Sequence, residues 1–217
     1  MQKKYKCLLF DLDGTLLDTA PQFLDCLNNV LAQNNLSKVS SEFVRNRVSD
    51  GVIRLIKDGF KIDDENPQFE LLREKMYEEY SKNFLDSKPF PGVEEFLKKL
   101  EKKRIDWMIV TNKPRKFTQD ICQSLKWTEH AKGIISPEDA DGQRKPDPAT
   151  LKVALSKTKY ESSSVIYVGD NWRDVEAAKN CNIDSALALY GYIDKKDACL
   201  LNPTSRISQI EELEYYI

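Results

Sequence analysis

The segment Asp11-Leu12-Asp13-Gly14-Thr15 places two carboxylates at the end of a short apolar run and follows them at once with a turn. The run, Cys7-Leu8-Leu9-Phe10, predicts a buried strand, and the Asp-Gly pair is a turn signal. Both acids are therefore expected where a strand gives way to a loop, which is where α/β sheets carry their chemistry. Two carboxylates placed in this way can hold one hard cation while one of them attacks and the other moves protons. Taken alone, the segment is equally typical of a polar strand end capped by a hairpin turn.

The length and charge of the chain narrow the classes of protein that it can be. Its 217 residues are enough to bury a sizeable core, in one large domain or in one domain carrying a smaller inserted one. The 33 basic and 35 acidic residues are distributed along the whole sequence and leave a net charge of −2. No excess of positive charge is available to hold a polyanion, so we do not expect nucleic acid as a partner.

The sequence predicts a cytoplasmic protein. The apolar run that ends at Phe10 is far shorter than a signal-peptide core, and no stretch is long enough to span a membrane. The five cysteines are scattered without C-x-x-C spacing, which favours a reducing compartment and argues against a zinc site. We therefore expect neither a membrane partner nor a structural metal of that kind.

The chain divides into two kinds of sequence. Between residues 19 and 87 apolar residues recur at helical spacing, as at Phe23 and Leu27, which predicts an all-helical domain. Residues 1–18 and 88–217 are predicted to form an α/β core into which that domain is inserted.

In the core, β-like and helical segments alternate after the break at Pro89-Phe90-Pro91-Gly92. Strands are predicted at 7–10, 105–110, 133–135, 165–168 and 186–189, and helices at 93–103, 116–125, 149–157 and 175–180. Such alternation implies right-handed crossovers and a Rossmann-like parallel sheet, with the helical insertion over its carboxyl edge. Ile207, Ile210 and Leu213 lie at helical spacing near the end of the chain, which predicts a terminal helix docked on the sheet.

Further polar groups follow the predicted strands or lie in the loops beside them. Thr111 and Asn112 come directly after Val110 and offer a hydroxyl and an amide that can donate to phosphate oxygens. Lys145 lies in Arg144-Lys145-Pro146-Asp147-Pro148, where two prolines stiffen the backbone around one ammonium. A fixed positive charge is what a developing phosphoryl charge requires, although a loop lysine is more often a solvated surface charge.

Two more carboxylates follow the predicted strand at 165–168. Asp170 comes just after that strand, and Asp174 lies four residues further on, on the same face if a helix begins near Trp172. Left unpaired beside Asp11, these carboxylates would repel one another. A divalent cation would remove that repulsion, and Mg²⁺ suits an all-oxygen site that also keeps waters and a phosphate.

Four segments together resemble the ordered motifs of the haloacid dehalogenase superfamily. They are Asp11-Leu12-Asp13-Gly14-Thr15-Leu16-Leu17-Asp18, Thr111-Asn112-Lys113, Lys145-Pro146-Asp147-Pro148 and Gly169-Asp170-x-x-x-Asp174. The helical stretch 19–87 resembles the small cap of the phosphoglycolate phosphatase-like branch, and Tyr190-Gly191-Tyr192 is similar to a stretch found there. The resemblance spans nearly the whole chain and implies an α/β fold, a Rossmann-like parallel sheet core with a small inserted all-helical cap domain.

The resemblance implies a magnesium-dependent phosphatase that hydrolyses a small phosphoglycolate-like phosphomonoester through an aspartyl-phosphate intermediate. Asp11 would be the nucleophile of that reaction. Asp13 would protonate the leaving group and then, as its conjugate base, activate the hydrolytic water. The transferring group would be held by Thr111, Asn112 and Lys145.

The metal site that the resemblance implies draws on the same acids. Mg²⁺ would bridge Asp11, Asp170 and a phosphate oxygen, and the backbone carbonyl of Asp13 would complete the protein ligands. Asp174 would bind the ion directly or orient the groups that do.

Other activities remain open alternatives. Dehalogenation needs neither a metal nor a second acid, so it would leave Asp13, Asp170 and Asp174 without a role. A sugar-phosphate mutase shares the nucleophile, the acid/base and the metal, and differs in how the cap excludes water. Thr111-Asn112-Lys113 resembles the phosphatase form of its motif more than the mutase form. A non-catalytic phosphate-binding or regulatory module is a third alternative, against which the filled catalytic positions argue.

Substrate choice is expected to lie in the cap, because the core sees only the phosphate. Arg47 and Ser49 lie in a loop before a helix containing Arg54, and a helix N-terminus flanked by arginines is suited to a carboxylate. Ser49 stands where the phosphoglycolate-type loop often has its first glycine, and Asp50 adds a negative charge. This departure leaves the substrate unassigned, and the arginines are equally compatible with a solvated helical face. The expected partner is a small phosphorylated molecule, and the protein is expected to be a monomer or a homodimer.

Overall fold

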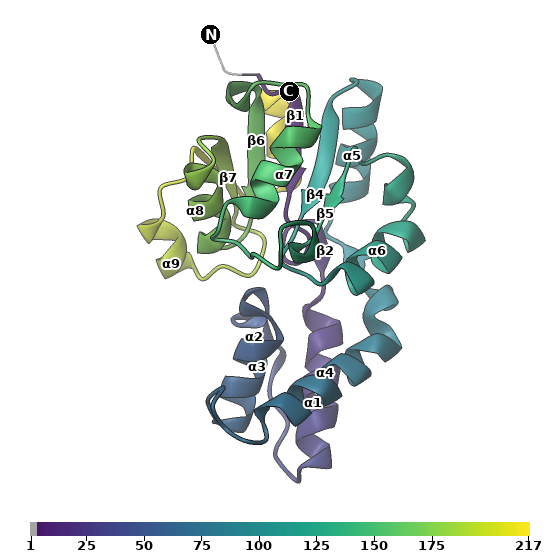
Figure 1. Cartoon of the computed structure of the whole chain (residues 1–217), viewed down its shortest axis with the longest axis vertical. Helices are drawn as coiled ribbons and strands as arrows, with labels where there is room; N and C mark the ends of the chain where they lie inside the picture. The colour runs from purple at the N-terminus through teal and green to yellow at the C-terminus, as the bar shows by residue number, and fades with distance from the viewer. Residues whose placement is uncertain (1–3) are drawn as a thin grey trace. The chain divides into compact units, whose positions relative to one another are not determined.

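In the computed structural model, which describes residues 4–217, the strand before the paired acids lies inside a six-stranded sheet (Figure 1). The strands are β1 (Cys7–Phe10), β4 (Asp106–Val110), β5 (Ile134–Ile135), β6 (Val165–Gly169), β7 (Asp184–Ala188) and β8 (Ser205–Ile207). They follow the order β5-β4-β1-β6-β7-β8, and each neighbouring pair is parallel. Phe10, the last residue of β1, is in register with Ile109 of β4 and Val168 of β6. The loop after β1 therefore begins between the loops that follow β4 and β6.

Helices cover both faces of this sheet. They are α5 (Val93–Lys102), α6 (Arg115–Ser124), α7 (Ala149–Lys157), α8 (Trp172–Asn180) and α9 (Lys195–Leu200), with 3₁₀ turns at Trp127–Glu129, Pro137–Asp139, Ser162–Ser164 and Ile210–Tyr216. Side chains alternate along a strand, so Leu9 points to the face that α7 and α8 cover, where it joins an apolar cluster with Leu151 and Ala177. Phe10 points to the opposite face and meets Phe96 of α5 edge to face. Burial on both faces explains why β1 is apolar throughout rather than alternating.

The α/β fold class predicted from the sequence is confirmed, with local differences in where elements begin. β7 starts at Asp184 rather than at residue 186, and α8 starts at Trp172 rather than at residue 175. The largest difference is at the C-terminus, where the predicted helix through Ile207 is wrong. Ile207 ends β8, which pairs with β7, and only Ile210–Tyr216 is helical, as a 3₁₀ turn. The unpaired edge of β7 offers backbone hydrogen bonds that outweigh a weak helical spacing.

The chain divides by its contacts into two units, and the second unit is helical between its ends. The first unit extends to Leu17 and resumes at Pro89, whereas the second runs from Asp18 to Lys88. The second unit contains α1 (Ala20–Gln33), α2 (Ser41–Arg45), α3 (Gly51–Phe60) and α4 (Phe69–Asn83), with 3₁₀ turns at Val48–Asp50 and Phe84–Asp86. Short strands β2 (Leu17–Asp18) and β3 (Lys88–Pro89) pair where the chain leaves and re-enters the first unit.

The helices of the second unit form their own core. α1 packs on α4, and the ring of Phe23 stacks on that of Tyr80 with centroids 4.3 Å apart. Each helix buries one apolar stripe, which is the origin of the helical spacing in this part of the sequence. Within residues 4–217, none of the helices combines the length and the apolar character needed to cross a lipid bilayer.

Candidate active site

Residues that follow neighbouring strands form the candidate site. Asp11 comes directly after β1, Thr111 after β4 and Asp170 after β6. Because these strands are parallel and adjacent, the residues after them meet at one edge of the sheet. The structure gathers there every candidate that the sequence analysis placed in the core: Asp11, Asp13, Thr111, Asn112, Lys145, Asp170 and Asp174.

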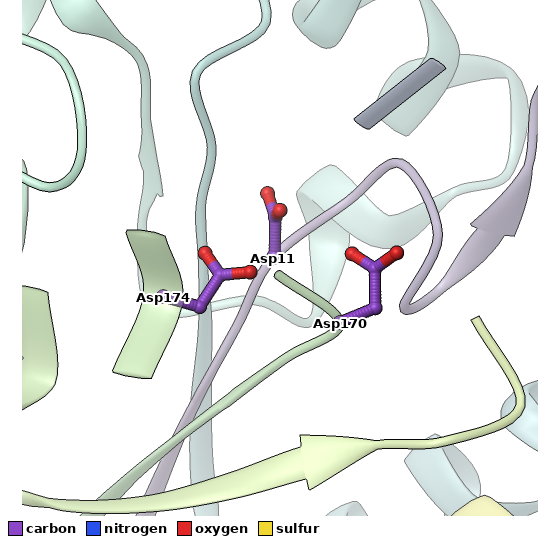
Figure 2. Close-up of side chains that lie close together, drawn as sticks. All are labelled: Asp11, Asp170 and Asp174. Atoms are coloured by element: carbon purple, nitrogen blue, oxygen red, sulfur yellow. The ribbon is translucent and has the colours of Figure 1, made fainter. Parts of the chain in front are cut away.

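Three carboxylates form a cluster that could hold a metal ion. Asp11, Asp170 and Asp174 each present one oxygen, and these oxygens lie within 4.8 Å of one another. Figure 2 shows the three side chains close together, with Asp11 between Asp174 and Asp170 in this view. Asp170 and Asp174 are only 0% and 2% exposed. An all-oxygen, negatively charged group of this kind fits a hard divalent cation such as Mg²⁺. The side chain of Asp13 is outside the cluster, and the assignment of its backbone carbonyl to the ion stays a prediction.

Backbone N–H groups orient two of these carboxylates. Asp174 is the third residue of α8 and closes a capping box, in which its Oδ2 accepts the N–H of Asn171 at 3.0 Å. Oδ2 of Asp170 accepts the N–H of Tyr192 at 2.9 Å. Hydrogen bonds from the main chain therefore orient both of these carboxylates.

Glycines let the backbone pass close to the same carboxylates. A Cβ at Gly191 would lie 2.3 Å from the carbonyl oxygen of Gly14 and 2.4 Å from Cβ of Asp170. At Gly14, where φ is +84°, a Cβ would lie 2.2 Å from Oδ2 of Asp170. A Cβ at Gly169 would lie 2.3 Å from Cγ of Asp174. A side chain at Gly14 or Gly169 would displace a carboxylate of the cluster, and one at Gly191 would displace either Asp170 or the Gly14 carbonyl.

Lys145 supplies the cation of the site. Its Nζ lies 2.9 Å from Oδ1 of Asp11 and 2.8 Å from Oδ1 of Asp174. It also donates to the hydroxyl of Tyr167 at 2.6 Å, and that hydroxyl donates to the carbonyl oxygen of Val110 at 2.8 Å. Lys145 is 3% exposed, so it is not the solvated loop charge that remained an alternative above.

Asn112 and Thr111 shape the loops around this lysine. Nδ2 of Asn112 donates to the carbonyl oxygen of Lys145 at 3.0 Å, and Oδ1 accepts the N–H of Lys145 at 2.8 Å. This reciprocal pair ties the loop after β4 to the loop that carries the lysine. Oγ1 of Thr111 accepts the N–H of Lys113 at 3.1 Å, which leaves the threonine hydroxyl hydrogen for an oxygen acceptor.

Burial and mutual attraction set the protonation of the central groups. Burial raises the pKa of the Asp11 carboxyl to about 6, against the attraction of Lys145 and with the repulsion of Asp174 adding to the rise. Burial acts to lower the pKa of Lys145, but Asp11 and Asp174 more than offset it, so that pKa is raised. Burial and the nearby carboxylates raise the pKa of Tyr167 well above its usual value. Lys145 is therefore charged, and the Tyr167 hydroxyl protonated, at neutral pH.

Sequence reasoning missed several residues of this edge. Lys113 was quoted only as part of a motif, yet its Nζ lies 3.1 and 3.2 Å from the two carboxylate oxygens of Asp13. In the sequence, Tyr167 is identified only as part of the predicted strand at 165–168. Gly191 is identified only as part of the segment Tyr190-Gly191-Tyr192. A tyrosine within an otherwise apolar buried strand was the one available signal, because a buried hydroxyl needs a partner.

Two of the candidates from the inserted domain, Arg47 and Arg54, share a partner within the second unit. Nε of Arg47 lies 2.6 Å, and Nε of Arg54 2.9 Å, from the same Oδ2 of Asp58. Ser49 lies in the 3₁₀ turn Val48–Asp50, directly before α3. Asp58 was missed by the sequence analysis, although its i,i+4 spacing from Arg54 on a helix is a recognisable signal.

Comparisons with known proteins agree with this geometry. The family profile described as "Haloacid dehalogenase-like hydrolase" matches residues 8–188. The chain is 34% identical over 195 residues to an N-acetylmuramic acid 6-phosphate phosphatase of Pseudomonas aeruginosa, covering 89% of this chain and 86% of that protein. It is 35% identical over 192 residues to a phosphoglycolate phosphatase of Xylella fastidiosa, covering 88% of this chain and 83% of that protein.

A solved structure shows the same fold. A hydrolase of the haloacid dehalogenase-like family from Streptococcus pneumoniae superposes with a TM-score of 0.83, covering 98% of this chain and 99% of its own. The sequence identity is 18%, so this likeness concerns the fold alone. The resemblance inferred from the four motifs is confirmed by the family profile and by the curated relatives.

Gly191→Ala is expected to disable the acid cluster while the sheet still forms. The added methyl group must displace either the Gly14 carbonyl or Asp170, so Mg²⁺ affinity should fall by about 10- to 100-fold, the usual effect of disturbing groups that orient metal ligands. Titration calorimetry with Mg²⁺ measures this directly. Gly142→Ala is the control, because an added methyl group there would meet no atom within 4 Å, although Gly142 has a positive φ that Gly191 lacks. Equal affinity in the Gly191 variant and the wild type would contradict the assignment.

Asp11 is expected to make the metal-free protein less stable as pH rises. Its pKa rises from 3.8 to about 6 on folding, so the folded state binds the extra proton between about pH 4 and pH 6. The free energy of unfolding therefore falls through that window, and Asp11→Asn should remove this part of the slope. Urea unfolding of both proteins in a chelator, at several pH values across the window, tests the prediction. Parallel pH profiles for the two proteins would show that Asp11 does not titrate in this way.

Proposed function

The chain belongs to the haloacid dehalogenase-like hydrolase family, and on that basis we propose that it is a Mg²⁺-dependent phosphatase of small phosphomonoesters. The observation that carries the proposal is Asp11, which touches a buried ammonium on Lys145 and belongs to a cluster of acids able to hold a cation. A nucleophile between two positive charges is what attack on a phosphate dianion requires. Both curated relatives described above are named for the hydrolysis of a phosphomonoester, which supports the same reaction class.

Asp11 is the proposed nucleophile. Its Oδ1 accepts the N–H of Leu12 at 2.7 Å and faces Lys145, so Oδ2 is the proposed attacking oxygen. The bond from Asp11 to phosphorus forms as the ester P–O bond breaks, and Asp13 gives its proton to the departing oxygen. A water oxygen then bonds to phosphorus and its proton passes to the Asp13 carboxylate. The aspartyl P–O bond breaks, which releases phosphate and restores Asp11.

Lys145, Thr111 and Asn112 are proposed to hold the transferring group. Lys145 is buried and tied to fixed partners, so its charge is in place before the phosphoryl group arrives and little reorganisation is needed. Thr111 retains a hydroxyl hydrogen that can donate to a phosphate oxygen. Asn112 already engages the backbone of Lys145 through both ends of its amide, so its main contribution is to position that loop.

The acid cluster is the proposed Mg²⁺ site. Asp11, Asp170 and Asp174, with the backbone carbonyl of Asp13, would hold the ion, which supplies Lewis-acid stabilisation of the phosphoryl charge. The residues fit this role because the cluster holds three carboxylates while Lys145 pairs with only two of them, Asp11 and Asp174, an excess of negative charge that would repel a phosphate on its own.

The unit from Asp18 to Lys88 is proposed to act as the cap, with Arg47, Ser49 and Arg54 selecting the substrate. Two arginines share the single carboxylate of Asp58, which leaves one net positive charge in their cluster. N-acetylmuramic acid 6-phosphate and phosphoglycolate, named in the relatives, both carry a carboxylate in addition to the phosphate. We therefore propose a carboxylate-bearing phosphomonoester as the substrate class.

The cysteines bear on where the enzyme acts. Each of the five is free, and Cys199 alone among them is exposed. Unpaired thiols suit a reducing compartment, so we propose a cytoplasmic enzyme.

The direct test is p-nitrophenyl phosphate hydrolysis with Mg²⁺ and with a chelator. We expect release of p-nitrophenol that requires Mg²⁺ and that falls by about 10³-fold or more in Asp11→Asn, because the nucleophile is lost. Release by wild type that does not exceed the Asp11 variant would contradict the proposed function. Formation of glucose 6-phosphate from β-glucose 1-phosphate would instead indicate the mutase.

Substitution of a cap arginine tests the substrate class. Arg54→Met should raise KM for phosphoglycolate or N-acetylmuramic acid 6-phosphate by about tenfold, the effect of one lost charged hydrogen bond, with less effect on p-nitrophenyl phosphate. Lys57→Met is the matched control, because it removes a positive charge from the same helix without touching Asp58. Equal KM changes for substrates with and without a carboxylate would argue against this role.

A further inference from the structure

We propose that Lys113 is a positioning residue that holds the Asp13 carboxylate at the leaving group and away from the metal-binding acids. The inference rests on the proposed phosphatase function and assigns a role to a residue that the mechanism above does not use. The contact lies wholly within the first unit, so it does not depend on the cap.

The contact between the two side chains is close and shielded. Nζ of Lys113 lies 3.1 Å from Oδ1 and 3.2 Å from Oδ2 of Asp13, so the ammonium meets both oxygens almost equally. The Lys113 side chain is 3% exposed and that of Asp13 is 19% exposed. With so little water around it, the Coulomb attraction between the two charges is screened less than in an ion pair on the surface.

The backbone of Lys113 is anchored on both sides. Its N–H donates to Oγ1 of Thr111 at 3.1 Å, and its carbonyl oxygen accepts the hydroxyl of Thr118 at 3.3 Å. Pro114 follows directly and restricts the chain further. The ammonium therefore projects from a fixed point, which is the condition for holding a catalytic group in place.

The two acids in the loop after β1, Asp11 and Asp13, pair with different lysines. Asp11 and Asp13 are two residues apart, and either could in principle join Asp170 in binding a cation. In the structure Asp11 faces Lys145 and belongs to the acid cluster, whereas Asp13 faces Lys113 and does not. A carboxylate that binds a metal ion is held at the ion, so this separation leaves the Asp13 side chain free to face the leaving group.

Two competing roles for Lys113 predict different kinetics. A lysine that binds the phosphate itself would affect all phosphomonoesters alike and would also weaken binding of inorganic phosphate. A lysine that only stabilises the fold would lower activity on all substrates in proportion to the loss of folded protein. A lysine that positions the general acid affects substrates according to how much protonation their leaving group needs.

The experiment compares an aryl with an alkyl ester in Lys113→Met. The alkyl ester is whichever of phosphoglycolate and N-acetylmuramic acid 6-phosphate wild type hydrolyses faster, and the aryl ester is p-nitrophenyl phosphate, whose leaving group departs with little protonation. We measure kcat/KM, because it reports only the steps up to departure of the leaving group. The loss in kcat/KM should be at least about tenfold larger for the alkyl ester, since general acid catalysis contributes about 10²- to 10⁴-fold. The inhibition constant of inorganic phosphate should change by less than about twofold.

A double variant and two further single variants complete the test. In an Asp13→Asn background, adding Lys113→Met should change alkyl-ester kcat/KM by less than about twofold, because the group it positions is gone. Lys113→Gln keeps a hydrogen-bond donor without the charge, so it should show a smaller loss of kcat/KM that is again larger for the alkyl than for the aryl ester. This variant provides the test if Lys113→Met does not fold. Lys116→Met, an exposed lysine on α6, is the matched control and should alter neither substrate.

The outcomes separate this inference from the proposed function. An active wild type whose Lys113 variants lose aryl and alkyl activity equally would overturn the positioning role and leave the phosphatase intact. Full additivity of the Lys113 and Asp13 substitutions would overturn it as well. A wild type no more active than Asp11→Asn would overturn both.

Discussion

The candidate site depends on one buried ammonium held between carboxylates. Lys145 is 3% exposed and reaches Asp11 at 2.9 Å and Asp174 at 2.8 Å. Removing one partner of a buried ion pair typically costs about 3–5 kcal/mol, because the remaining charge is left without compensation. The loop that carries Lys145, the end of β1 and the start of α8 are therefore held in one arrangement, and the other site residues take their places around it.

In this arrangement the carboxylates of the acid cluster outnumber the ammonium group that pairs with them. Asp170 adds a third carboxylate to the cluster, and its position is set by the N–H of Tyr192 and by the close passage of Gly14 and Gly191. Holding like charges together inside a protein opposes folding, and a bound cation would relieve that repulsion. Backbone contacts orient Asp170 and Asp174, so a cation that bound there would meet carboxylates already held by the main chain.

Much of the fold could be predicted because its signals are local. The apolar run of β1 followed by Asp-Gly indicates a strand end, and the alternation of strands with helices indicates a parallel sheet; both are confirmed. The prediction failed at Ile207, where pairing with the edge of β7 overrode a helical spacing. The candidate acids were identifiable for the same reason, since residues directly after neighbouring parallel strands share one edge. Their roles in a reaction rest on the proposed function.

The sequence by itself determined where β1 and β4 end and, through four motifs, the family to which the chain belongs. Only the tertiary structure decided which lysine meets which acid. Lys113 and Asp13 are 100 positions apart, and Lys145 and Asp174 are 29 apart. No local pattern encodes such pairs, because the order of the strands and the burial of the ammonium groups decide which charges meet.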